Sequence, residues 1–159
     1  PEHVKVINIE TANDMLDAVK KINNIDVAIC AAAVSDWAIK NPSKNKIKKN
    51  NKNFPEINFL LNPDILEYIS NQKSNRPKLV IGFAAETNDL IKNAKDKLKS
   101  KKCDWIIANN VLDDSDIFGG ENNTVTLITR DNIEPWDKCS KTDIAKKLSN
   151  KVIKEILGS

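Results

Sequence analysis

Small and acidic residues follow an apolar run early in the chain, at residues 32–37 (AAVSDW). Small side chains let a ligand approach the backbone. The carboxylate of Asp36 is an acceptor for ribose hydroxyls or a ligand for a bound cation. This pattern predicts a nucleotide contact, although it also fits an ordinary exit from a strand into a loop.

A cluster of lysines follows at residues 46–49 (KIKK). An ammonium group binds phosphate as a point charge and can stabilise a developing oxyanion. Lysine supplies nearly all of the positive charge of this chain, in which only Arg76 and Arg130 are arginines. A solvated basic loop is therefore the alternative interpretation of this cluster.

A third candidate is the helix start at residues 62–66 (NPDIL), where Asn62 is a good N-cap and Pro63 suits the first turn. A helix N-terminus presents free N–H groups and the positive end of the helix dipole, which favour a phosphate. Plain capping without a ligand is the alternative.

The fourth candidate is residues 82–87 (GFAAET) with the helix that follows. Leu90, Ala94, Lys97 and Lys101 recur at helical spacing, so two lysines continue a face that begins apolar. This placement predicts that they point toward an anion at the sheet edge, such as a triphosphate. Alternatively, Ile91 and Leu98 define the buried face and the lysines lie at its margin. Phe83 either covers a base or fills the core.

Short apolar runs alternate with helical patterns along the chain, which indicates an α/β fold with a mostly parallel sheet and helices on both faces. We expect strands over residues 4–9, 26–33, 57–61, 78–84, 105–109 and 124–129. We expect helices over 11–24, 62–72, 88–102 and 141–157, capped by Thr11, Asn62, Thr87 and Ser140. Residues 34–53 should form a long functional loop and 110–123 a second loop. Open α/β sheets bind ligands at the carboxyl ends of their strands, where the candidate segments would lie.

The bulk composition limits the classes of function. A net charge of +3 does not indicate nucleic-acid binding, and no run approaches the roughly 20 apolar residues of a membrane span. Three cysteines without CxxC spacing and no signal-peptide pattern indicate free thiols in the cytoplasm. The single histidine, His3, excludes a multi-histidine metal site, and no protein metal site is expected.

Taken in order, AAVSDW, KIKK, NPDIL, GFAAET and KKCDWIIANN (residues 101–110) resemble the phosphopantothenate–cysteine ligase family. This family forms the synthetase half of the bacterial bifunctional coenzyme A biosynthesis protein. The resemblance runs from about residue 4 to 157 and implies a Rossmann-like three-layer sandwich with a long flap loop, a homodimer, and CTP-dependent ligation of 4′-phosphopantothenate to L-cysteine. It implies an acyl-cytidylate intermediate, Mg²⁺ with the triphosphate, and Lys46 as the catalytic residue. By motif position the CTP contacts would be Cys30, Ala31, Ala32, Asp36, Lys46, Pro63, Asp64, Ile65, Leu66, Phe83, Lys97 and Lys101.

The sequence departs from this family pattern in two ways. The family's opening strand and Gly-rich turn are missing, so we expect residues 1–159 to be one N-terminally truncated CTP-binding synthetase domain that binds CTP weakly and is inactive alone. The flavin-dependent decarboxylase half, expected as a partner domain in the full-length chain, is also missing, so no FMN is expected. A Rossmann-like NAD(P)-binding oxidoreductase is the main alternative, but no GxGxxG occurs. A non-catalytic basic binding module is the other alternative.

Overall fold

The computed structural model describes residues 3–43, 45–46, 56–110 and 122–158. The chain forms two compact units. The first comprises Pro1–Lys21 and Ala33–Asp64, and the second comprises Ile22–Ala32 and Ile65–Ser159. Among the described residues, no helix is long and apolar enough to cross a membrane.

The first unit holds helix α1 (Ala12–Lys20) and strands β2 (Trp37–Ile39) and β3 (Phe59–Leu61). The predicted capping box of α1 is confirmed. The Thr11 hydroxyl accepts from the N–H of Asp14 at 3.1 Å, and the Asp14 carboxylate accepts from the N–H of Thr11 at 2.9 Å. Such a cap stabilises a helix by about 1 kcal/mol. Strands β2 and β3 form an antiparallel ribbon in which Trp37 pairs with Leu61 and Ile39 with Phe59.

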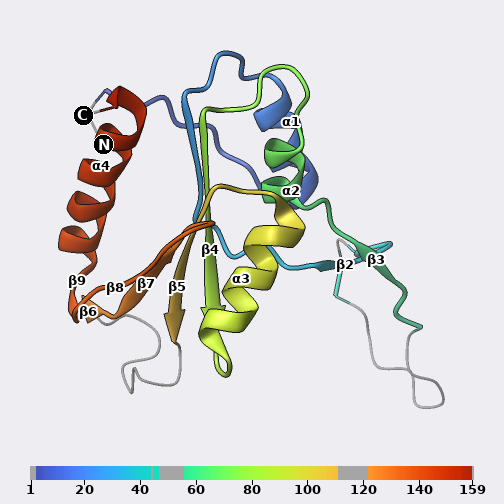
Figure 1. The fold of residues 1–159 in the computed structure, drawn as a ribbon. Coiled ribbons are helices and arrows are strands. Elements are labelled where there is room, and N and C mark those ends of the chain that lie inside the picture. Colours follow the sequence, from blue (N-terminus) through green and yellow to red (C-terminus); the bar gives the residue numbers. More distant parts are fainter. Residues whose placement is uncertain (1–2, 44, 47–55, 111–121, 159) are drawn as a thin grey trace. The chain divides into compact units, whose positions relative to one another are not determined.

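The second unit is built on a five-stranded sheet in the order β1-β4-β5-β7-β8 (Figure 1). Its strands are β1 (Val27–Cys30), β4 (Leu79–Glu86), β5 (Trp105–Asn110), β7 (Val125–Ile128) and β8 (Ile133–Pro135). The pairs β1–β4 and β4–β5 are parallel, whereas β7 and β8 join antiparallel. A short ribbon of β6 (Asn122–Asn123) and β9 (Cys139–Ser140) leads into the last helix.

Helices cover both faces of this sheet, which gives the predicted three layers. Figure 1 shows α4 (Lys141–Leu157) on one side and α2 (Ile65–Ser70) and α3 (Leu90–Lys101) on the other. Because side chains alternate along a strand, Ile81 and Ile107 pack in one cluster with Ile144 of α4. On the opposite face a Cβ on Gly82 would come within 2.6 Å of the Leu66 side chain in α2. Glycine at position 82 therefore allows α2 to lie directly on β4.

An arginine clamp joins the amino-terminal ends of β4 and β5. The Arg76 Nη2 contacts both carboxylate oxygens of Asp104 at 3.0 Å, and its Nε donates to the Ser70 carbonyl at 2.9 Å. The other carboxylate contact of Asp104 is the N–H of Val80 at 2.7 Å. A planar guanidinium can serve several acceptors at once, which explains why arginine stands here in a lysine-rich chain.

Several predicted boundaries are wrong. Residues 4–9 form no strand, because no described strand pairs with them and the side chains of Val4 and Val6 remain exposed. Helix α1 ends at Lys20, before the predicted residues 23–24. The predicted long loop over 34–53 contains strand β2. Residues 44 and 47–53 of this loop lie outside the described residues, as do 111–121 of the second predicted loop.

The starts of two helices also differ from prediction. Helix α2 begins at Ile65, not at Pro63, because Asn62 donates its hydrogen bonds to the carbonyls of Ser35 and Asp36. Helix α3 is not capped by Thr87. Its N-cap is Asp89, in the left-handed region at φ 49°, without a side-chain capping bond. Asn93 instead fixes the preceding loop by donating to the Asn88 carbonyl and the Glu86 carboxylate. The predicted Ser140 cap of α4 is confirmed, since its hydroxyl accepts from the N–H of Asp143.

Candidate functional site

The carboxyl ends of β1 and β4 form the edge where the sequence predicts a ligand. Strand β1 ends at Cys30 opposite Gly82, and β4 continues for four more residues to Glu86. Beyond β1 the chain leaves through Ala31 and Ala32, which are exposed, while Cys30 is half-buried. The small residues therefore stand at an accessible strand exit, as predicted. Strand β1 is less buried than expected, because it is the edge strand of the described sheet and only Ala28 is fully buried.

Lys97 reaches the backbone of β4 beyond the end of β1. Its Nζ donates to the carbonyl oxygen of Phe83 at 2.9 Å in a half-buried position. The Phe83 side chain is half-buried and packs against the core cluster on the α4 side of the sheet, which favours the core-filling interpretation of its ring. A carbonyl oxygen carries no formal charge, so this contact does not neutralise the ammonium group.

Lys101 ends helix α3 and turns toward α2. Its Nζ forms an ion pair with the Glu67 carboxylate at 3.0 Å. Ala94 and Leu98 are the buried residues of α3, and both lysines are half-buried beside them. The lysines thus lie at the margin of the buried face, although Ile91, which the alternative interpretation also assigns to that face, is only half-buried. They nevertheless turn toward β4 and α2, the side on which an anion is expected.

The residues at the start of α2 could bind a phosphate through backbone N–H groups rather than through side chains. Ile65 and Leu66 are buried in the core, while Pro63 is half-buried and Asp64 is exposed. The six residues of α2 make it too short for its dipole alone to indicate a ligand. Ile65 and Leu66 can therefore meet a phosphate only through their N–H groups.

Asn62 joins two of the predicted motifs within the first unit. Its N–H donates to the carbonyl of Asp36 at 2.9 Å, and its side-chain amide donates to the carbonyl of Ser35 at 2.8 Å. These two bonds hold Ser35 and Asp36 beside Asn62. The Asp36 carboxylate is exposed and takes part in neither bond. This role of Asn62 is not evident from the sequence, because an asparagine before a proline is also a good helix cap.

Lys46 is exposed, and residues 47–49 of the KIKK motif lie outside the described residues. The second unit holds Cys30, Ala31, Ala32, Ile65, Leu66, Phe83, Lys97 and Lys101, and the first holds Asp36, Lys46, Pro63 and Asp64. Eight of the twelve predicted contacts thus lie in the second unit.

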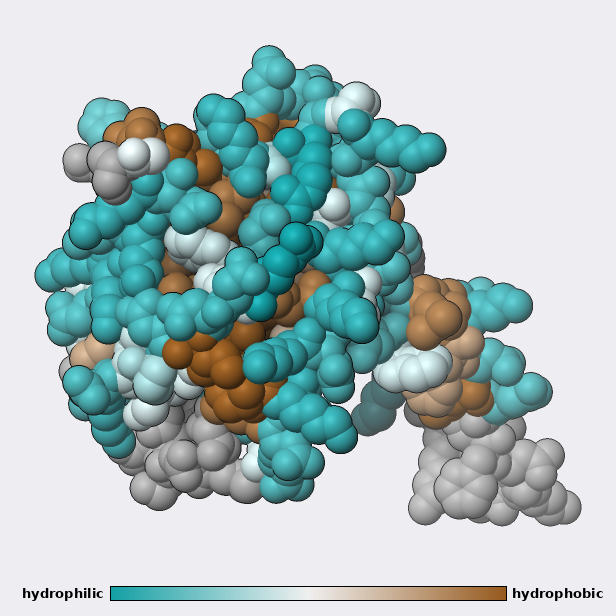
Figure 2. Space-filling model, viewed as in Figure 1, coloured by the Kyte–Doolittle hydropathy of each residue, from teal (hydrophilic) through white to brown (hydrophobic). Residues whose placement is uncertain are grey.

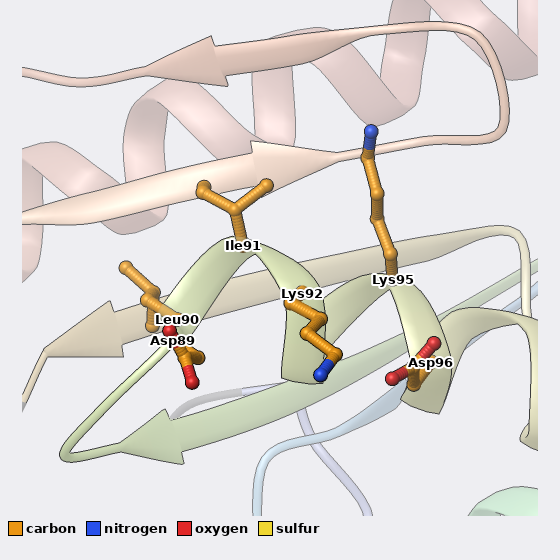
Figure 3. A pocket seen from close by; sticks show the side chains of 6 residues that line it. All are labelled: Asp89, Leu90, Ile91, Lys92, Lys95 and Asp96. Atoms are coloured by element: carbon orange, nitrogen blue, oxygen red, sulfur yellow. The ribbon is translucent and has the colours of Figure 1, made fainter.

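Other features of the second unit do not point to chemistry. Burial raises the pKa of the Cys103 thiol to about 11, so this group stays protonated and unreactive near neutral pH. A surface hollow on α3 is lined by Asp89, Leu90, Ile91, Lys92, Lys95 and Asp96 (Figure 3). It includes neither Lys97 nor Lys101, and its two acidic residues offset its two lysines. Within the described ranges, no three His, Cys, Asp or Glu side chains group to hold a metal ion.

Comparison with known proteins identifies the family. Residues 1–156 match the model of the DNA/pantothenate metabolism flavoprotein C-terminal domain. The chain belongs to this family. It is 39% identical over 150 residues to the coenzyme A biosynthesis bifunctional protein CoaBC of Borreliella burgdorferi, a match that covers 93% of this chain and 37% of the relative. The chain therefore spans little more than a third of that curated relative.

Solved structures of the family share the fold. A crystal structure of the C-terminal domain of a coenzyme A biosynthesis bifunctional protein CoaBC aligns with a TM-score of 0.72 at 27% identity, covering 99% of this chain and 67% of that chain. The DNA/pantothenate metabolism flavoprotein from Streptococcus pneumoniae aligns with a TM-score of 0.68 at 18% identity, covering 91% and 70%. The α/β fold with a mostly parallel sheet is thus confirmed.

Proposed function

We propose that this chain is a phosphopantothenate–cysteine ligase domain that uses CTP in coenzyme A biosynthesis. Membership in the family over residues 1–156 carries this proposal. The ammonium group of Lys97, which contacts the Phe83 carbonyl of β4 just beyond the end of β1, supports it, because a triphosphate needs cations near the strand ends. The alternative of an NAD(P)-dependent oxidoreductase has no GxGxxG motif within residues 1–159 to support it.

We assign the nucleotide contacts from the family resemblance, by motif position. Cytidine would lie on the accessible exit at Cys30, Ala31 and Ala32, where small side chains permit close approach. Lys97 and Lys101 would hold the phosphates. Phe83 would contribute through its backbone, since its ring packs in the core.

Contacts from the NPDIL segment and from Asp36 complete the proposed set. Pro63 and Asp64 precede α2, and the N–H groups of Ile65 and Leu66 would face the phosphates. The Asn62 N–H holds the Asp36 backbone, and the Asp36 carboxylate is exposed. This carboxylate would accept hydrogen bonds from ribose hydroxyls or help to hold the cation.

The proposed reaction has two steps. The carboxylate of 4′-phosphopantothenate attacks the α-phosphate of CTP, and pyrophosphate leaves. The amine of L-cysteine then attacks the acyl carbon of the acyl-cytidylate, forms the amide and displaces CMP. Lys46 would stabilise the negative charge that develops in these steps, a role for which a positioned cation is effective. Mg²⁺ would bind chiefly through the triphosphate oxygens, as it does in many nucleotide-dependent enzymes.

The β2–β3 ribbon supports a homodimer. Direct cross-strand pairing puts Trp37, Ile39, Phe59 and Leu61 on one side, where they are 59%, 47%, 65% and 70% exposed. Figure 2 shows the hydrophobic surface on this ribbon. Exposed apolar faces of this kind mark interaction sites, and a second copy offers an identical apolar face. Replacing Trp37 and Leu61 by serine should yield monomers in analytical ultracentrifugation, and an unchanged dimer would contradict this assignment.

A thermal-shift comparison of CTP, ATP, NAD and RNA tests the nucleotide assignment. We expect CTP with Mg²⁺ to raise the unfolding temperature more than ATP, and NAD to have no effect. A larger shift with NAD would favour the oxidoreductase, whereas stabilisation by RNA alone would favour a basic binding module. We propose a cytoplasmic location, where free thiols stay reduced and where these substrates occur.

A further inference from the structure

The ion pair between Lys101 and Glu67 joins two helices at the proposed phosphate site. Lys101 is the last residue of α3, and Glu67 lies in the first turn of α2, next to the buried Ile65 and Leu66. The Nζ and the Oε2 are 3.0 Å apart, within direct contact. A carboxylate thus stands within reach of a cation that the proposed function assigns to the triphosphate.

This pair has little to contribute to folding. The side chains of Lys101 and Glu67 are 28% and 50% exposed, and ion pairs with such access to water contribute little to stability. Its effect on charge is larger, because a carboxylate at contact distance offsets the ammonium group that an incoming anion would meet. Lys97, the other lysine of the site, contacts an uncharged carbonyl oxygen instead. The charge of Lys101 is therefore partly offset by a carboxylate, whereas the carbonyl contact of Lys97 leaves its charge in place.

We propose that Glu67 is a built-in counter-ion that competes with a bound phosphate for Lys101 and thereby limits the affinity of the site for polyphosphates. This proposal rests on the proposed function. Pyrophosphate, which the first step of that reaction leaves behind, is highly charged and would be retained by unopposed lysines. When it dissociates, Lys101 regains Glu67 as its partner. Glu67 thus favours product release at the expense of tight CTP binding.

Calorimetric titration of the full natural gene product with pyrophosphate, tripolyphosphate and CTP tests this inference. Glu67→Gln keeps the size of the side chain and removes its charge, so binding of all three anions should tighten about two- to fivefold. The gain should shrink in high salt, because salt screens exposed charges. Glu155→Gln, an exposed site on α4, makes the same change in net charge and should leave affinity unchanged.

The double variant Glu67→Gln with Lys101→Ala shows whether the effect passes through Lys101. When Lys101 is already alanine, adding Glu67→Gln should no longer tighten binding. The ammonium group for which the carboxylate competes is then absent. Weaker or unchanged binding by Glu67→Gln would overturn the proposal, as would a gain that persists without Lys101.

Failure of the two proposals can be told apart. If CTP binds natively and Glu67→Gln binds it equally well, the counter-ion role is wrong and the ligase assignment stands. If CTP fails to bind but tripolyphosphate shows the predicted tightening through Lys101, the counter-ion role stands and the nucleotide assignment is wrong. If no anion binds either protein, both are overturned.

Discussion

Replacing Arg76 by lysine should destabilise the second unit strongly, although the substitution keeps the positive charge. The guanidinium contacts both oxygens of Asp104 at 3.0 Å and donates to the carbonyls of Ser70, Pro77 and Lys102 at 2.9, 3.0 and 3.2 Å. An ammonium group places its donors at one point and cannot serve acceptors spread around a planar fork. At least two of these bonds should be lost.

The magnitude follows from the bonds lost. A hydrogen bond contributes about 1 kcal/mol net and more when it involves a charge, so Arg76→Lys should lower the free energy of unfolding by about 2–3 kcal/mol. For a chain of 159 residues this corresponds to a fall in the unfolding temperature of about 5–10 °C. Asp104→Asn should act similarly, because it removes the charge that faces Arg76 and weakens the acceptor of the Val80 N–H.

Urea unfolding followed by tryptophan fluorescence measures the loss, since Trp105 is buried next to Asp104. The slope of free energy against urea should stay constant if stability alone changes. The matched control is Arg130→Lys at the other arginine, which is exposed and should change stability by less than about 0.5 kcal/mol. An Arg76→Lys protein as stable as the Arg130→Lys control would refute the clamp.

Three further predictions concern catalysis and pH. Lys46→Gln should reduce the rate of ligation at least about 100-fold, because a charge at a developing oxyanion contributes about 3 kcal/mol. The circular dichroism spectrum should stay native, and near-normal turnover would remove Lys46 from the mechanism. Lys97→Ala combined with Lys101→Ala should raise the KM for CTP more than the KM for phosphopantothenate, and equal effects would mark both as surface lysines. The Lys151 ammonium bonded to Glu134, and then the Trp136 indole, hold the pKa of that carboxyl below its usual 4.5. A depressed carboxyl pKa stabilises the fold above the unfolded-state value, and this contribution is lost as pH falls through the folded-state value. Glu134→Gln should therefore lower the free energy of unfolding by up to about 1 kcal/mol at pH 7 and change it little near pH 2. Urea titrations at both pH values measure this difference. An equal loss of stability at both pH values would refute the contribution of the ion pair.

Elements with local signals were predictable from sequence. The caps at Thr11 and Ser140 each need only a residue three positions away, so the starts of α1 and α4 follow from the sequence alone. The apolar runs of β4 and β5 are long enough to identify as buried strands. Strand β4 carries the Phe83 carbonyl that Lys97 contacts, so this part of the candidate site lies on a predictable element.

Elements that depend on distant partners were not predictable. Residues 4–9 have strand-like residues but no described partner, whereas the three residues of β2 become a strand only by pairing with β3. Asn62 has the sequence of a helix cap, yet its bonds go to Ser35 and Asp36, 27 and 26 positions away.

In the candidate site, too, local features were predictable from the sequence and contacts with distant residues were not. Helical spacing places Lys97 and Lys101 together, but their partners, Phe83 and Glu67, belong to other elements. The presence of arginine at position 76 in a lysine-rich chain was the one sequence signal that could have indicated the clamp.

Pyrophosphate release from CTP, measured with each substrate omitted in turn, tests the ligase assignment most directly. With the full natural gene product and Mg²⁺, release should require phosphopantothenate, and phosphopantothenoylcysteine should form only when cysteine is added. A first turnover of pyrophosphate should occur without cysteine, because the acyl-cytidylate forms before the amine attacks. Release that is independent of phosphopantothenate, or a folded protein that releases none from CTP, would contradict the account.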